Sequence, residues 1–338
     1  MSNEPAAVRS GTTSASFIIG ALVLVLAIGG ALYCGESIVR QLVSGLMLGA
    51  IYMTVAVAFT LTVGVLNFLN FTIPTLFMLT GMVAWGLMAK GYVNFAGGWA
   101  WLTALTAGVA VAVVASLIVE RFTFRYLKMK HGDATEHAIP LVSSLGFLLI
   151  FEHLVLLSLG SESERFSVPF DADIRIGYLV VGVPQVASSV LAVAVVAALS
   201  FLLRRSRIGR ALRTIAENAD TALLLGVETN KLVPVVFILT GLLAGLAGAL
   251  FTVNYRNVSP FMGDDVGTKA VAAMVIGGLG SIWGSIAGGL IVGVIETLSV
   301  YFFGGDSVQM VVWTILLAIL IVRPQGLLGT AASVPSRL

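Results

Sequence analysis

Long apolar runs constrain the fold of this chain more than any other feature of its sequence. A bilayer core about 30 Å thick needs roughly 20 helical residues to cross it, and apolar runs of about that length recur along the chain. They are rich in Leu, Ala, Val and Gly without strand-type alternation, which favours helices over a β-barrel. The sequence predicts an all-α fold: a polytopic transmembrane helical bundle with eight to ten membrane segments, some of them discontinuous or re-entrant. The runs lie at about 17–34, 41–66, 75–89, 99–119, 138–160, 185–203, 232–253, 268–300 and 309–322.

The composition excludes several other classes of protein. Only 11% of the 338 residues are charged and 58% are apolar, whereas roughly a quarter of a soluble domain is charged. Disorder is excluded by the apolar fraction, and Cys34 alone cannot build a disulfide scaffold. The net charge of +2, without a run of like charges, indicates no nucleic-acid partner. The expected surroundings are therefore a lipid bilayer.

The basic residues predict the orientation of the bundle, because Lys and Arg concentrate on cytoplasmic loops. Most of the 19 basic residues fall in two loops, one of them 204–231, and near the C-terminus, whereas the loop at 161–184 is more acidic. We expect a short cytoplasmic N-terminal tail over 1–16, a transmembrane domain over 17–322 that includes the cytoplasmic segment 204–231, and a cytoplasmic C-terminal tail over 323–338.

The run at 268–300 is longer than one simple span requires. Gly277, Gly278, Gly280 and Gly284 cluster near its middle, and this much glycine favours a break between two helical arms. A re-entrant or discontinuous pair would also keep the C-terminus on the cytoplasmic side.

Two polar interruptions contain both Asn and Pro. Backbone that leaves the helix within lipid is tolerated where it is buried in protein or lines a cavity, and paired interruptions in two halves of a transporter point to its translocation site. We predict an intramembrane break at 67–74 and a loop at 254–265, although a loop at the first position is the alternative. The candidates for lining a translocation pathway are Asn67, Asn70, Thr72, Pro74, Asn257 and Ser259.

Small residues recur at the spacing that lets helices approach closely. Gly280, Gly284 and Gly288 follow each other at every fourth position, as in GxxxG packing motifs. We predict that these are helix-packing glycines, and a pore lined by small residues is the alternative.

Few ionisable groups are candidates for a role within the membrane. Glu152 and His153 lie near the end of one run, and Glu296 either lies deep in another run or marks the end of its helix. No ladder of such groups indicates a proton relay. The chain also contains no phosphate-binding P-loop and no cluster of metal-ligand residues, so we predict no catalytic site and no metal site.

The segment 204–231 predicts a short amphipathic helix. Its apolar residues follow a spacing of three and four, as at Ile208, Leu212 and Ile215, which places them on one face. Such a face needs a partner, either another protein element or the surface of the lipid bilayer. The residues alone leave both alternatives open.

Several sequence strings resemble a known family. AENADTALLLGV and FILTGLLAGLAGALF, followed by GGLGSIWGSIAGGL and VRPQGLLG, are similar to the LivH-type permease subunit of branched-chain amino acid ABC importers. The resemblance covers about residues 38–330. It implies a permease domain over 17–322 in a bacterial inner membrane, and a transport subunit rather than an enzyme.

The family resemblance also implies partners. They are a second related permease subunit, two ATPase subunits that bind ATP and Mg²⁺ so that this chain needs no cofactor of its own, and an external substrate-binding protein that delivers a small molecule. The residues expected to couple the chain to the ATPase are Arg213, Glu217, Asp220, Ala222 and Gly226. A self-contained secondary transporter or channel for a small polar solute is the alternative.

One departure from the family pattern bears on the substrate. Phe71 is followed by Thr72, Ile73, Pro74 and Thr75, where LivH-type proteins commonly have a small residue, His and Gly. Branched-chain amino acids are therefore an expectation from the family, and urea, amides and other amino acids remain open.

Overall fold

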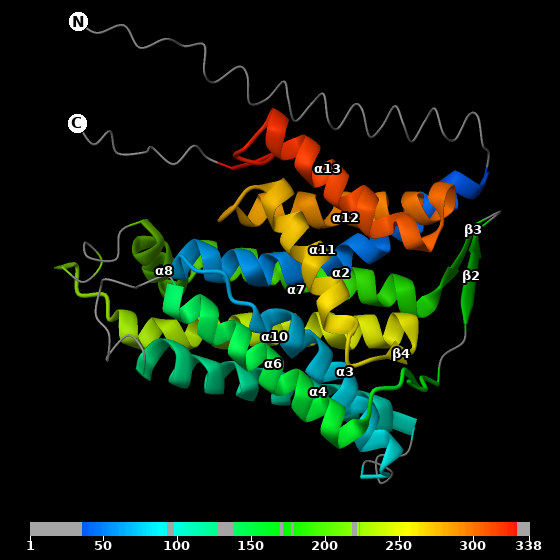
Figure 1. Cartoon of the computed structure of the whole chain (residues 1–338), viewed down its shortest axis with the longest axis horizontal. Coiled ribbons are helices and arrows are strands. Elements are labelled where there is room, and N and C mark those ends of the chain that lie inside the picture. The colour runs from blue at the N-terminus through cyan, green and yellow to red at the C-terminus, as the bar shows by residue number, and fades with distance from the viewer. Residues whose placement is uncertain are drawn as a thin grey trace, which may run out of the picture.

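The computed structural model of the chain (Figure 1) describes residues 36–92, 98–126, 138–169, 172–176, 179–217, 222 and 224–329. The expected tail at 1–16 and the expected first span at 17–34 lie outside the described residues.

Helices make up nearly all of the described part. Eight of them are long and apolar enough to cross a membrane, which confirms the predicted polytopic all-α bundle. Among the described residues there are also two shorter helices, a π-helical turn, Glu120–Tyr126, and a 3-10 turn, Gly305–Ser307, which extends the last span at its start. The eight are α2 (Glu36–Leu66), α3 (Thr72–Ala89), α4 (Ala100–Val119), α6 (Ala138–Leu159), α7 (Val183–Arg205), α10 (Thr229–Tyr255), α12 (Ile282–Phe303) and α13 (Val308–Val322), and the shorter ones are α8 (Arg207–Glu217) and α11 (Met262–Gly277).

Four short strands accompany the helices, and the sequence did not predict them. β1 (Glu164–Arg165) pairs antiparallel with β4 (Asn257–Val258), and β2 (Asp173–Ile176) pairs antiparallel with β3 (Leu179–Gly182). In Figure 1, β2 and β3 lie at the opposite end of the bundle from α8. Arginines cluster on α8, which the positive-inside rule predicts for a cytoplasmic segment; we call this the basic end of the bundle and the end with β2 and β3 the strand end.

α2 is the central helix of the bundle, in contact with α7, α10, α11 and α12. Every residue from 48 to 62 is buried, as is typical of a helix that is apolar on all sides. Its threonines do not leave polar groups unpaired: Thr54 donates to the carbonyl of Ala50 at 3.0 Å, and Thr62 donates to that of Phe59 at 2.8 Å. The core of the bundle is therefore built around α2.

Glycines on both helices bring α2 and α12 together. A Cβ on Gly293 would collide with the backbone of Gly49, and a Cβ on Gly289 would collide with that of Met53. Gly45 faces α12 in the same way. Reciprocal GxxxG spacing thus allows backbone to pack directly on backbone, which is how membrane helices gain packing energy without a hydrophobic driving force.

The predicted break in the run at 268–300 is confirmed. α11 ends at Gly277 and α12 begins at Ile282, and Gly278 has φ +110°. The C-terminal segment closes this gap, because the amides of Leu327 and Leu328 donate to the carbonyls of Ile276 and Gly277 at 2.8 and 2.9 Å. Carbonyls at the end of α11, which have no partner within the helix, are satisfied by residues about 50 positions away.

Replacing Gly293 with valine tests the α2–α12 contact. The added side chain overpacks the interface, which typically costs about 1–3 kcal/mol, so G293V should lower the free energy of unfolding in detergent micelles by that amount. G146V is the matched control, because Gly146 is exposed on α6 with open space around its Cβ position. Equal stability of the two variants would contradict this packing.

Candidate translocation pathway and coupling surface

The α2–α3 connection, residues 67–71, is a break whose polar groups are satisfied within the protein. Asn70 is fully buried, and its Oδ1 accepts hydrogen bonds from the amide and the hydroxyl of Thr72 at 3.1 and 2.7 Å. The amide of Phe71 donates to Ser144 Oγ of α6 at 3.2 Å. Asn70 therefore closes the first turn of α3, and only its Nδ2 has no partner.

The pathway candidates of this break differ in exposure. Thr72 is fully buried, and Pro74 lies so close to α11 that a Cβ on Gly263 or Gly267 would collide with it. Asn67 is exposed and adopts a left-handed conformation with φ +56°, which Asn tolerates better than most residues. Pro74, near the start of α3, therefore packs against α11, whereas Asn67 of the break is exposed.

The second interruption lies elsewhere. Asn257 belongs to β4, and Ser259 follows it in the connection between α10 and α11, where its Oγ accepts from the amide of Phe261 at 3.3 Å. The predicted loop within 254–265 is therefore confirmed as non-helical backbone, although it is shorter than expected because α10 extends to Tyr255 and α11 begins at Met262. Asn257 lies at the strand end of the bundle, whereas Asn67 lies at the basic end. The structure therefore does not bring the two sets of pathway candidates together.

The three regularly spaced glycines do not share one environment. A Cβ on Gly284 would collide with the carbonyl of Gly277, and one on Gly288 would collide with that of Ala273, so both face α11. Gly280 belongs to neither helix: it lies in the α11–α12 connection with φ +78°, within 4 Å of Gly64 on α2.

A buried ion pair inside the bundle escaped the sequence analysis. Lys269 Nζ of α11 donates to Glu296 Oε1 of α12 at 2.7 Å and to Asp265 Oδ2 at 2.9 Å. The side chains of Lys269 and Glu296 are 7% and 14% exposed, whereas that of Asp265 is 50% exposed. The ammonium also lies 5.8 Å from the ring centroid of Tyr52 on α2. One buried cation thus holds three helices together.

This ion pair corrects one sequence interpretation. Glu296 does not mark the end of its helix, because α12 continues to Phe303. Lys269 was visible in the sequence as a lysine within an apolar run, four residues after Asp265. Ionisable residues in membrane segments are functional candidates by default, so Lys269 and Glu296 join the candidate site.

The apolar face of α8 packs on the membrane bundle of the same chain. Leu212 and Ile215 are buried, and α8 contacts α2, α7 and α10. Ser206 directly precedes the helix, and its Oγ accepts a hydrogen bond from the amide of Gly209 at 2.9 Å, as an N-cap does. Ile208, expected on the apolar face, is 41% exposed. The partner that the sequence left open is therefore the chain itself.

The predicted coupling residues do not all lie on one side of this segment. Glu217 and Gly226 are exposed, Gly226 with φ +79°, whereas Ala222 is fully buried. Arg213 is exposed too, but its guanidinium turns toward α7 and donates to the carbonyl of Arg204 at 3.3 Å. Asp220 lies outside the described residues. Next to Gly226, the side chains of Leu224 and Leu225 are 89% and 70% exposed. We call Glu217, Leu224, Leu225 and Gly226 the coupling surface.

The described residues also bear on metal binding and on the class of protein. Among them, no group of three or more His, Cys, Asp or Glu side chains is arranged to hold a metal ion. A multi-pass bundle with two broken apolar runs, a buried ion pair and a basic amphipathic helix has features typical of membrane transport proteins.

The comparison with known families identifies that class. The profile of the family described as "Branched-chain amino acid transport system / permease component" matches residues 41–322. The chain therefore belongs to this family and is a permease component.

Individual relatives agree with the family assignment. BraD of Pseudomonas aeruginosa, a high-affinity branched-chain amino acid transport system permease protein, is 29% identical over 86% of this chain and 95% of its own length. LivH of Escherichia coli, with the same description, is 28% identical over the same shares. The fructose import permease protein FrcC of Rhizobium meliloti is 26% identical over 72% of this chain and 81% of its own length.

Removing the charge of Lys269 tests the buried ion pair. K269M leaves Glu296 as an uncompensated buried charge and should lower the free energy of unfolding by about 3–5 kcal/mol, measured by denaturant titration in detergent micelles. The double variant K269M/E296Q should recover much of that loss, because neither charge is left unpaired.

The matched control is K231M, which breaks the exposed pair of Lys231 with Glu228. Exposed pairs contribute about 0–1 kcal/mol, so K231M should remain close to the parent chain. A K269M variant as stable as K231M would mean that water reaches the pair.

Proposed function

We propose that this chain is the membrane-spanning permease subunit of an ATP-driven importer in a bacterial inner membrane. It forms part of the translocation pathway together with a second, related permease subunit. ATP and Mg²⁺ bind to two separate ATPase subunits, and an external substrate-binding protein delivers the cargo.

The proposed cargo is a branched-chain amino acid or a related small amino acid or amide. BraD and LivH are described as permease proteins of branched-chain amino acid transport systems, and each matches this chain over 95% of its own length. The fructose permease FrcC is less similar and matches less of the chain, which favours an amino-acid cargo over a sugar.

The observation that carries the proposal is the position of α8. Its apolar face is fixed to α2, α7 and α10, so a force applied to its other side is transmitted to membrane helices. That other side presents Glu217, and the exposed Leu224 and Leu225 follow. Exposed leucines next to charged residues are typical of a protein interface. The coupling surface is therefore the proposed docking site of the ATPase.

The exposed face of α11 supports a shared pathway. Asp264, Asp265 and Thr268 are exposed in this chain alone. Charged side chains in membrane segments face other protein or a water-filled cavity rather than lipid, so this face is proposed to meet the second permease or the pathway. Pro74 lies directly behind α11, and the α2–α3 break would thus act on the pathway by positioning α11.

Reconstitution in liposomes separates this proposal from a self-contained transporter or channel. We expect uptake of radiolabelled leucine only when the chain is combined with its second permease, its ATPase subunits, its binding protein and ATP. An ATPase subunit that cannot hydrolyse ATP should abolish uptake. Flux through this chain alone would overturn the proposal.

The coupling surface is tested by reversing one of its charges. E217K should weaken ATPase docking by about tenfold or more, because a hydrogen bond to a charged group contributes about 1.5–3 kcal/mol. Uptake per ATP hydrolysed should fall accordingly. G226A should also impair coupling, since a left-handed conformation costs a residue with a Cβ about 1–2 kcal/mol.

The matched control for these variants is E162K, which makes the same charge change at an exposed position of the acidic external loop. It should leave the ratio of uptake to ATP hydrolysis unchanged. A normal ratio in both E217K and G226A would rule out this surface as the coupling site.

A further inference from the structure

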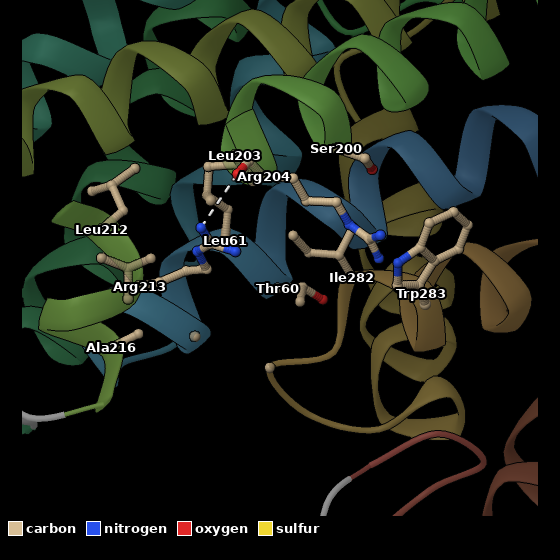
Figure 2. A pocket seen from close by; sticks show the side chains of 13 residues that line it. Thr60, Leu61, Ser200, Leu203, Arg204, Leu212, Arg213, Ala216, Ile282 and Trp283 are labelled. Carbon is tan, nitrogen blue, oxygen red and sulfur yellow. Dashed lines mark hydrogen bonds between the residues drawn. The ribbon is translucent and has the colours of Figure 1, made fainter. Parts of the chain in front are cut away.

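A cavity of about 330 Å³ lies at the basic end of the bundle, between α2, α7, α8 and the start of α12 (Figure 2). Its volume falls within the range of small-ligand pockets, about 300–1,000 Å³. Leu61, Leu203 and Ile282 contribute apolar walls, and the guanidinium groups of Arg204 and Arg213 approach it from two different helices.

Neither arginine has an anionic partner in the described part of the chain. Among the described residues, no carboxylate lies within ion-pair distance of either guanidinium. The guanidinium of Arg204 lies 5.2 Å from the ring centroid of Trp283, and Arg213 donates to the carbonyl of Arg204 at 3.3 Å. Both side chains are exposed in this chain alone, and an arginine carries five N–H donors, so most of their donors have no acceptor within the described part of the protein.

A buried hydroxyl points to the same conclusion. Ser200 lines the cavity, is only 8% exposed, and its Oγ has no hydrogen-bond partner. Buried polar atoms in proteins almost always have a partner. A donor on α7 is therefore left for a ligand, beside two positive charges.

The surroundings identify the chemical class of that ligand. Guanidinium groups bind phosphate with particular affinity, and basic pockets between membrane helices on the cytoplasmic side bind acidic lipid head groups. Trp283, which lines the cavity beside Arg204, is 53% exposed, and exposed aromatic side chains near a membrane interface lie at head-group level. A free phosphate shares the charge of such a head group but not its acyl chains.

We propose that this cavity binds the phosphate group of an anionic phospholipid from the cytoplasmic leaflet. Arg204, Arg213 and Ser200 supply the donors, and the acyl chains extend past Trp283 into the bilayer. The bound phosphate connects α7 with α8 next to the first turn of α12. It therefore holds α8 in place, whatever the cargo of the transporter.

The binding test uses the full-length chain released from lipid into detergent, with bound lipid counted by native mass spectrometry. Phosphatidylglycerol should bind at one saturable site, phosphatidylcholine should not, and R204Q should weaken phosphatidylglycerol binding by about tenfold. R213Q should act in the same direction, which provides a second variant if one of them unfolds. Thermal unfolding midpoints establish that each variant is folded.

The matched control is R205Q. Arg205 is the next residue on α7 and its guanidinium lies 5.9 Å from the ring centroid of Phe201, but it does not line the cavity. R205Q should bind phosphatidylglycerol like the parent chain. Equal losses in R204Q and R205Q would mean a general attraction of basic residues to acidic lipid and would overturn the site.

Competition distinguishes the sources of the phosphate. Inorganic phosphate at the concentration of the lipid should not displace phosphatidylglycerol, because it cannot make the apolar contacts; equal displacement would overturn the lipid assignment. In nanodiscs that hold the whole transporter, R204Q should abolish the stimulation of transport by phosphatidylglycerol. A higher KM for cargo or weaker ATPase assembly in R204Q, without any change in lipid binding, would instead assign the cavity to the pathway or to the ATPase.

Discussion

Backbone hydrogen bonding without water is the constraint on which the rest of this bundle depends. Within lipid, a helix can be broken only if its freed amides and carbonyls find partners in the protein. The chain solves this twice with distant segments: Ser144 of α6 accepts from the break at 67–71, and the amides of Leu327 and Leu328 close the end of α11. Each break is therefore a tertiary feature, stable only when the bundle around it is assembled.

Close backbone packing and buried charge follow from that arrangement. Glycines let α12 lie directly on α2, and α11 returns beside them because its break at Gly278 is closed. This brings Lys269 and Glu296 from two neighbouring arms into contact at 2.7 Å. A buried pair of this kind contributes less to stability than its Coulomb attraction suggests. Its stronger effect is on register, because sliding α11 along α12 would leave both charges unpaired.

The sequence predicts the membrane spans well, but it predicts poorly which side chains and helices they contact. Both results have physical reasons. Length and hydropathy set the helices, and clustered glycines set the break after Gly277, because both are local properties. Lys269 was overlooked because a single lysine barely lowers the hydropathy of a long run, and only its pairing with Glu296 reveals its importance. The amphipathic pattern of α8 specifies a face but not what covers it. Nor could Asn70 be recognised as closing the first turn of α3, since that depends on where Thr72 begins the helix.

At the basic end of the molecule, α8, the cavity and the α11–α12 connection lie next to one another. α8 rests on α2 and α7, and the cavity beside it is bordered by Gly64, Gly280 and Trp283. Gly280 belongs to the connection that residues 326–329 hold against α11. A displacement of α8 would be passed to α2, which contacts both α11 and α12, the two helices that carry the Lys269–Glu296 pair. An anion bound between Arg204 and Arg213 would strengthen the connection between α8 and α7, because it would contact both helices at the point where the displacement begins.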